Sequence, residues 1–238
     1  MPESQTLLAV LAHPDDETFR PGGTLALLAR RGVRVVVLTA TRGEAGSCGD
    51  PPRCHPDELP LVRERELYCA CAALGIEPPR LLNHRDGNLH RVDPEEIIAQ
   101  ILHVVHAVRP QAILSFGPDG LSGHPDHIAI GQLAAAAFHR AESVVALYTM
   151  AVPQSVAARL KMTQIHAVPD GRITLTVDVS PAWDAKLAAI RCHATQLSAS
   201  SIMHAPLEQQ REFLGTEHFV RALTRNESPT CLDELRIE

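Results

Sequence analysis

The sequence lacks the features of membrane proteins and of nucleic-acid-binding proteins. Its 238 residues contain no apolar run near the roughly 20 residues that a membrane-spanning helix needs. The N-terminal stretch LLAVLA is too short for such a helix and lacks the cationic flank of a signal peptide. The formal net charge is -6 and aromatic residues make up only 3% of the chain, so neither a basic face nor a set of stacking rings is available for nucleic acid. We therefore expect a cytoplasmic protein with no membrane span and no nucleic-acid partner.

Cysteine is also scarce, with 6 residues in the chain. Neither their density nor their context is that of a disulfide framework, so we expect most of the thiols to be reduced. Cys69 and Cys71 fall within a helical pattern and are interpreted as small packing residues. Cys48 and Cys54 lie in a polar loop that could bind a metal or form a disulfide, but their spacing matches no zinc template and favours an ordinary loop.

The first 150 residues alternate between short apolar runs and longer amphipathic segments. This alternation is typical of βαβ units, and it predicts an α/β fold with a Rossmann-like, mostly parallel sheet flanked by helices. The expected strands lie at 6–12, 33–40, 80–83, 112–116 and 143–150, and the expected helices at 22–32, 60–74, 93–109 and 124–141.

The alternation weakens after residue 150. Short helical patterns at 155–162 and 182–196 flank an expected strand at 171–180, and the tail from Pro206 onward has no readable pattern. A chain of this length, 45% hydrophobic, can bury one substantial core. We therefore expect a single domain over 1–238, with a Rossmann-like core at 1–150 and a C-terminal α/β extension at 151–238 that completes it.

Two clusters of His and Asp follow expected strands. Open α/β sheets bind ligands outside the carboxyl ends of their strands, which is where HPDD (13–16) and HPDH (124–127) fall. A catalytic zinc site takes three imidazole or carboxylate ligands and leaves a position for water. The two clusters therefore predict a metal site at one edge of the sheet.

The residues within each cluster leave the division of roles open. Asp15 and Asp16 are adjacent and should diverge in direction, so one can bind the metal while the other acts as general base and then general acid. His124 and His127 are three residues apart at an expected helix start and face the same side, so either or both could bind the metal.

Several motifs together resemble the PIG-L/LmbE-like family of zinc N-deacetylases. The resemblance is carried by AHPDDETFRPGGT, TRGEAG, VRERELYCACAALG, GHPDH and KLAAIRCHATQ, and it extends to about Gln196. Members of this family remove acetyl groups from N-acetylglucosaminyl conjugates, including the phosphatidylinositol glycan precursor and the mycothiol and bacillithiol precursors. The resemblance thus implies a zinc-dependent hydrolase that releases acetate and a free amine from an amino-sugar conjugate.

The resemblance also implies roles for the clustered residues. The metal ligands would be His13, Asp16 and His127. Asp15 would deprotonate the attacking water and later protonate the leaving amine. His124 would stabilise the oxyanion, and Asp126 would orient or tune that histidine. Glu17 has no role that the sequence defines.

Five further residues are expected near the substrate. Arg63 matches an arginine on the RxxE helix of the family, with Glu66 as the Glu, and His193 resembles a histidine that approaches or buttresses the site. The remaining three candidates are Asp86, Glu44 and Arg20. Ser122 departs from the family pattern, since some relatives carry there a tyrosine that assists the oxyanion.

The sequence leaves several alternatives open. A related zinc amidase of the mycothiol-conjugate type would use the same residues on a larger amide, and a metal- or sugar-binding module would use the ligands without Asp15. A nucleotide-binding fold is disfavoured because the first turn contains no GxGxxG. The ligand set would also accept iron, cobalt or nickel. Relatives include oligomers, but no sequence feature fixes an oligomeric state or the aglycone.

Overall fold

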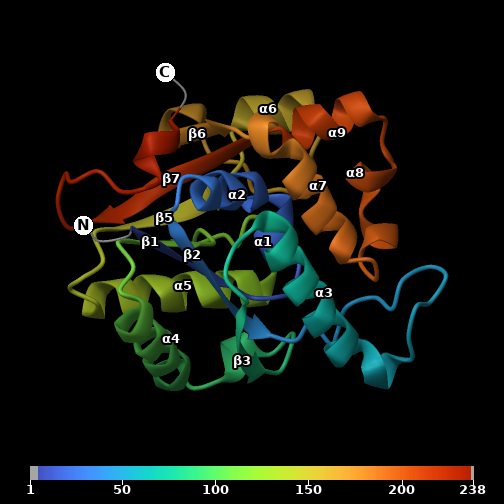
Figure 1. Ribbon diagram of the computed structural model, residues 1–238, viewed down its shortest axis with the longest axis horizontal. Helices are drawn as coiled ribbons and strands as arrows, with labels where there is room; N and C mark the ends of the chain where they lie inside the picture. Colours follow the sequence, from blue (N-terminus) through green and yellow to red (C-terminus); the bar gives the residue numbers. More distant parts are fainter. Residues whose placement is uncertain (1–4, 237–238) are drawn as a thin grey trace.

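A seven-stranded sheet runs through the molecule, which is represented by a computed structural model that describes residues 5–236 (Figure 1). Its strand order is β3-β2-β1-β4-β5-β7-β6. The five parallel strands are β1 (Thr6–Leu11), β2 (Arg34–Thr41), β3 (Arg80–His84), β4 (Ala112–Ser115) and β5 (Ala146–Ala151). The two added strands are β6 (Leu175–Asp178) and β7 (Thr216–Thr224), and β7 runs antiparallel to both of its neighbours, β5 and β6. The predicted mostly parallel α/β class is confirmed.

Helices cover both faces of this sheet (Figure 1). One face carries α4 (Pro94–Val108) and α5 (Pro125–Arg140), and the other carries α2 (Gly22–Arg30), α3 (Leu59–Leu74) and α7 (Trp183–Cys192). The shorter helices are α1 (Asp16–Phe19), α6 (Gln154–Arg159), α8 (Ser201–His204) and α9 (Leu207–Leu214). Every residue of the central strands β1, β4 and β5 is buried, as expected for a sheet covered on both sides.

Local signals explain where the main helices begin and end. The Asp93 carboxylate caps α4 by accepting a hydrogen bond from the Glu95 amide at 3.0 Å, and Pro94 occupies the first helical position. Helix α3 ends at Gly75, whose φ of 73° lies in the left-handed region that glycine adopts at low cost. These caps fix where α4 begins and where α3 ends.

The C-terminal part contains the strand that the sequence did not reveal. β7 lies between β5 and β6, and it pairs with β5 from Ala146↔Thr224 to Ala151↔His218. The first residues of β7 are buried or half-buried, whereas the last ones are half-buried or exposed. No clean two-residue alternation was therefore available to predict it.

β7 is also anchored to α2 by a buried carboxylate. Glu217 accepts hydrogen bonds from the backbone amides of Gly23 and Thr24, both at 2.8 Å, and pairs with Lys186 Nζ at 2.7 Å. Gly23 is required here because a Cβ on it would lie 2.3 Å from the Cβ of Val179. The start of α2 is thus closed by a side chain from the last strand.

A disulfide joins the seam between α3 and α7. Cys69 and Cys192 are bonded with a Cα–Cα distance of 5.7 Å across a sequence separation of 123. The interpretation of Cys69 as a packing thiol is therefore wrong, because its helix lies against α7 and brings the two sulfurs together. Cys71 is a buried free thiol as expected, and Cys48 and Cys54 are also free.

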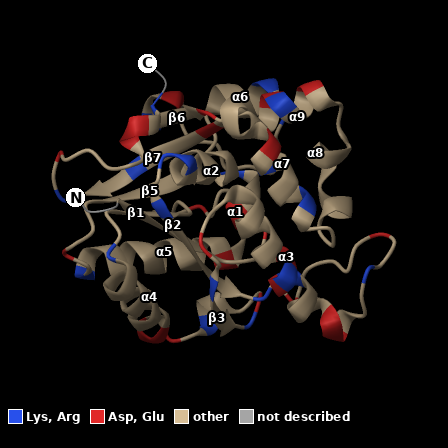
Figure 2. Ribbon diagram, in the orientation of Figure 1, with Lys and Arg blue, Asp and Glu red and all other residues tan. Residues whose placement is uncertain are grey.

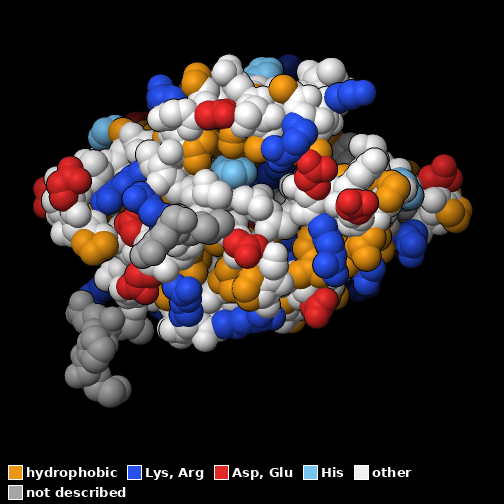
Figure 3. Space-filling model, turned by 90° about the horizontal axis from the view of Figure 1, so that it is seen from above, with side chains coloured by type: hydrophobic (Ala, Val, Ile, Leu, Met, Phe, Trp, Pro, Cys, Tyr) orange, Lys and Arg blue, Asp and Glu red, His pale blue; other side chains and the backbone are white. Residues whose placement is uncertain are grey.

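The surface of the described part of the chain carries charges of both signs. Acidic and basic residues alternate around the ribbon and across the face seen in the space-filling view (Figures 2 and 3). Neither view shows a broad patch of a single sign. Among residues 5–236, none of the helices combines the length and the apolar character needed to cross a membrane.

Tyr148 ties β5 to the C-terminal segment, and its hydroxyl provides a test of that contact. The fully buried side chain hydrogen-bonds Thr230 Oγ1 at 3.0 Å and donates to Asp233 Oδ2 at 2.8 Å. We expect Tyr148→Phe to lower the free energy of unfolding by about 2 kcal/mol, because a bond to a charged group is lost. Urea unfolding measures this loss. Tyr68→Phe is the control: Tyr68 is 46% exposed, and an equal loss there would contradict the assignment.

Candidate metal centre and active site

Three side chains from the two His-Asp clusters meet at the carboxyl edge of the sheet. His13 follows β1, Asp16 begins α1, and His127 lies in the first turn of α5. His13 Nδ1 lies 3.2 Å from His127 Nε2 and 3.8 Å from Asp16 Oδ2, and His127 Nε2 lies 3.2 Å from Asp16 Oδ1. The structure thus brings together the side chains of all three predicted metal-binding residues.

The spacing and the tautomers of this set fit a tetrahedral metal ion. Ligands about 2.0 to 2.1 Å from zinc are separated by about 3.3 Å in tetrahedral geometry. The 3.2 Å from His127 Nε2 to His13 Nδ1 and to Asp16 Oδ1 is close to that value, whereas His13 faces the other Asp16 oxygen at 3.8 Å. His127 Nδ1 lies 3.2 Å from the Gly120 carbonyl oxygen and can donate to it, which leaves Nε2 free to bind a metal. Zinc is therefore compatible with the donors that the chain presents.

The other ring nitrogen of His13 faces two carboxylates. His13 Nε2 lies 3.0 Å from Asp86 Oδ1 and 3.4 Å from Asp126 Oδ2. Asp126 is fully buried and also accepts hydrogen bonds from the amides of Gly87 and Leu89. A carboxylate on the far side of a ligand histidine fixes its orientation and raises its basicity. The Asp126 carboxylate therefore faces His13, while its expected role in orienting or tuning His124 stays a prediction.

The charges around these residues shift their pKa values strongly. Burial alone would lower the pKa of His13, but hydrogen bonds to Asp126 and Asp86 and the charge of Asp16 raise it to about 10. Burial would raise the pKa of Asp16, but the adjacent His127 holds it well below its usual range. Asp16 also accepts hydrogen bonds from the backbone amides of Ala12 and His13. The carboxylates of this cluster thus stabilise a positive charge that lies between them.

Asp15 diverges from Asp16 because its backbone adopts an uncommon conformation. Its φ of 107° lies in the region that favours glycine, and such strain concentrates at functional sites. The side chain is 24% exposed, compared with 8% for Asp16. Burial raises the pKa of Asp15 to about 6, against the lowering effect of Arg63. A carboxylate with that pKa can both accept and return a proton near neutral pH.

Arg63 holds Asp15 from α3. Its guanidinium donates to Asp15 Oδ2 at 3.0 Å, to the Gly43 carbonyl at 2.7 Å and to the Pro14 carbonyl. A Cβ on Gly43 would lie 2.1 Å from Arg63 Nη1, so glycine is needed where the guanidinium crosses the loop. The Arg63 side chain is only 4% exposed. In the free chain it acts as a positioning residue for Asp15, and its expected contact with substrate stays a prediction.

Glu17 and His193 form a buried support for Asp15. Glu17 accepts a hydrogen bond from the Asp15 amide at 2.9 Å, and its other oxygen lies 2.5 Å from His193 Nε2. Both side chains are fully buried. Burial lowers the pKa of His193, but the charge and hydrogen bond of Glu17, together with the charges of Asp15 and Glu66, raise it overall. The structure thus gives Glu17 a structural role that the sequence did not show, and it makes His193 a buttress.

His124 caps α5 and is oriented by that cap. Its Nδ1 accepts a hydrogen bond from the Asp126 amide at 3.2 Å, so the ring proton of the neutral imidazole lies on Nε2. The ring centroid lies 4.8 Å from those of both His13 and His127. Burial, followed by the charges of His13 and His127, lowers the pKa of His124. His124 is therefore a neutral hydrogen-bond donor beside the candidate metal centre.

Asp86 and Glu44 lie at the site, whereas Arg20 packs against Phe213. Asp86 contacts His13 and accepts from the Ala45 amide at 2.9 Å, and Glu44 Oε1 accepts from the Asp86 amide at 3.0 Å. One buried oxygen of Glu44 has no hydrogen-bond partner among the described residues. Arg20 instead lies over the ring of Phe213 at 4.3 Å, and burial lowers its pKa to about 10.

The Arg63 contacts lead to a prediction about turnover. We expect Arg63→Lys to lower kcat by about ten- to a hundredfold with unchanged metal content, because a lysine cannot make the three fork-like contacts that hold Asp15. Steady-state kinetics with metal analysis would measure both quantities. Arg65→Lys is the matched control on the exposed face of the same helix. A wild-type kcat in Arg63→Lys would show that the three guanidinium hydrogen bonds of Arg63 are not needed for turnover.

Together, the sheet edge and the cluster define a metal-dependent hydrolase site of the α/β class. A family model described as PIG-L, GlcNAc-PI de-N-acetylase, matches residues 8–138. A 1D-myo-inositol 2-acetamido-2-deoxy-alpha-D-glucopyranoside deacetylase from Kineococcus radiotolerans is 33% identical, covering 82% of this chain and 70% of its own. The chain therefore belongs to the PIG-L family.

Solved structures share the fold. The conserved protein TT1542 from Thermus thermophilus has a TM-score of 0.69 at 25% identity, with 94% of this chain and 97% of that chain covered. An N,N'-diacetylchitobiose deacetylase from Pyrococcus horikoshii has a TM-score of 0.68 at 19% identity, with 95% and 88% covered. The resemblance to the PIG-L/LmbE-like deacetylases is thus confirmed for family and fold.

Proposed function

We propose that the protein is a zinc-dependent N-deacetylase that hydrolyses the acetamide of an N-acetylglucosaminyl conjugate to acetate and a free amine. The observation that carries this proposal is the position of Asp15, strained and half-buried, beside His13 and His127, whose facing nitrogens are 3.2 Å apart, and Asp16, whose two oxygens each face one of these rings. A module that only binds a metal or a sugar has no use for such a base. The 33% identical deacetylase supports an inositol-linked N-acetylglucosamine as the substrate.

In this proposal His13, Asp16 and His127 hold the metal. A bound divalent metal would supply Lewis acidity and lower the pKa of water. Asp15 accepts the proton of the attacking water and returns it to the leaving amine as the C–N bond breaks. His124 Nε2–H donates to the oxygen of the tetrahedral intermediate. Arg63 and Glu17 keep Asp15 in place through its carboxylate and its backbone amide.

One experiment tests metal, reaction and substrate class together. Elemental analysis of the purified protein is combined with a free-amine assay over N-acetylglucosaminyl conjugates and one conjugate with a larger acyl group. We expect zinc near one per chain and amine release from the N-acetyl compounds. Release only from the larger amide would instead identify an amidase of the mycothiol-conjugate type, and no release from zinc-loaded protein would overturn the proposal.

A further inference from the structure

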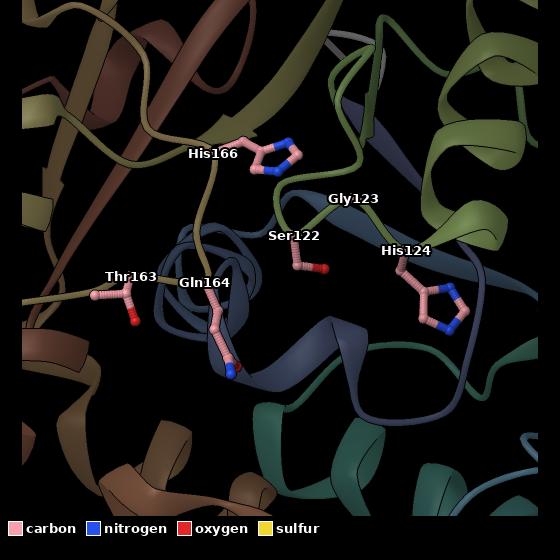
Figure 4. A pocket seen from close by; sticks show the side chains of 6 residues that line it. All are labelled: Ser122, Gly123, His124, Thr163, Gln164 and His166. Carbon is pink, nitrogen blue, oxygen red and sulfur yellow. The ribbon is translucent and has the colours of Figure 1, made fainter.

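A hollow is lined in part by His124, the residue beside the candidate metal centre. It has a volume of about 500 Å³, within the range of small-molecule sites, and is formed by two segments far apart in the chain (Figure 4). One segment lies between β4 and α5, and the other follows α6. The residues that line it are Ser122, Gly123, His124, Thr163, Gln164 and His166, and we call it the His124 hollow.

The lining of the His124 hollow is polar and contains no acidic residue, lysine or arginine. It offers two hydroxyls, one carboxamide and two imidazoles, and no lysine, arginine, aspartate, glutamate or aliphatic side chain. Figure 4 shows Ser122 and Gln164 on facing segments, with the Ser122 hydroxyl turned toward His124. Hydroxyl and amide groups pair with ligand hydroxyls, whereas a phosphate would call for cations and an acyl chain for apolar walls. This chemistry favours a neutral polyhydroxyl ligand.

The two walls of the hollow are tied to each other. The His166 amide donates to the Leu121 carbonyl at 2.8 Å, and the Val168 amide donates to the Val152 carbonyl at 2.9 Å at the end of β5. Gly123 has a φ of 76°, and a Cβ there would lie 3.1 Å from the His166 ring. The segment at 163–166 therefore keeps a fixed position relative to His124, the group that faces the reacting carbonyl in the proposed function.

We propose that the His124 hollow binds the aglycone of the substrate as an uncharged polyhydroxyl ring, with Thr163 and Gln164 as specificity-determining residues. This inference rests on the proposed function, and His124 links the two places, because it lines the hollow and its ring also lies 4.8 Å from those of His13 and His127. The aglycone hydroxyls replace water on the exposed hydroxyl and carboxamide groups. The hollow thus recognises the aglycone, and the residues around Asp15 recognise the acetamide.

The test measures binding without turnover. Zinc-loaded protein carrying Asp15→Asn is titrated calorimetrically with three probes: methyl 2-acetamido-2-deoxyglucoside, the same sugar linked to inositol, and that inositol compound bearing a phosphate on the ring. We expect the inositol glycoside to bind about tenfold tighter than the methyl glycoside, as two or three added hydrogen bonds would give. The phosphate should add no affinity.

Two isosteric changes then locate the preference. Thr163→Val and Gln164→Leu together should reduce the inositol-to-methyl ratio from about tenfold to about twofold or less, because the volume is kept and the hydrogen bonds are lost. Gln154→Leu, on an exposed glutamine of α6 outside the hollow, is the matched control and should leave the ratio unchanged.

The outcomes separate this inference from the proposed function. Equal affinity for the methyl and inositol glycosides, a large gain from the phosphate, or an unchanged ratio in the double variant would each overturn the aglycone site. A preference that disappears in the double variant supports it, even if wild-type enzyme hydrolyses none of the conjugates. That last result would overturn only the proposed deacetylase activity.

Discussion

Asp15→Asn is expected to lower kcat by about 10²- to 10⁴-fold while leaving close to one zinc per chain. The asparagine keeps the size of the side chain and can still contact Arg63, but it cannot accept a proton from water at neutral pH. Asp15 lies outside the three-residue ligand set, so its charge is not needed for metal retention. Amine release and elemental analysis on the same preparation would measure both effects.

The control for Asp15→Asn is a change of the same kind far from the site. Asp57 is 93% exposed on the loop before α3, and Asp57→Asn should leave kcat and zinc content at wild-type levels. Full activity of the Asp15 variant would exclude this residue as the base. Loss of zinc together with activity would assign Asp15 to the ligand set instead.

His127→Ala is expected to remove the metal itself. With one of three ligands gone, zinc content should fall from about one to below roughly 0.1 per chain after dialysis, and activity should fall with it. His127 also stacks on Phe116 with a centroid distance of 3.9 Å, so an alanine removes packing as well as a ligand. His127→Phe separates the two effects, because it keeps an aromatic ring and has no nitrogen.

Both His127 variants should lose zinc, and circular dichroism should show that they are folded. His139→Ala, on the exposed last turn of the same helix, serves as the control and should keep its metal. Stoichiometric zinc in His127→Phe would overturn the ligand assignment. In that case His124, whose ring centroid lies 4.8 Å from that of His13 compared with 5.1 Å for His127, would become the candidate third ligand.

The features that could be predicted from the sequence are those set by residues close together in the chain and by the order of the strands. Period and capping predicted α4 from Asp93 onward, and the parallel strand order brought the two His-Asp clusters to one edge. Spacing could not choose between His124 and His127, because both face the same side of α5. The choice depends on which ring nitrogen is free, and that is set by the Gly120 carbonyl for one and the Asp126 amide for the other.

The features that the sequence concealed depend on distant partners. Glu17 has no recognisable role until His193, 176 residues away, meets it in the core. Cys69 resembles a packing residue until Cys192 meets it across the seam of two helices. The Asp126 carboxylate lies beside a helix-capping histidine in the chain, yet in space it serves His13. Contacts between residues far apart in the chain produce no periodic pattern in a single sequence.

The carboxylate of Glu217 gives the start of α2 an anion from within the chain. In dinucleotide-binding folds of the Rossmann type, the free amides at the start of the first helix hold a pyrophosphate. Here the amides of Gly23 and Thr24 donate to Glu217, with Lys186 as its counter-ion. The last strand thus satisfies with a buried carboxylate the helix-start amides that such folds leave for a ligand.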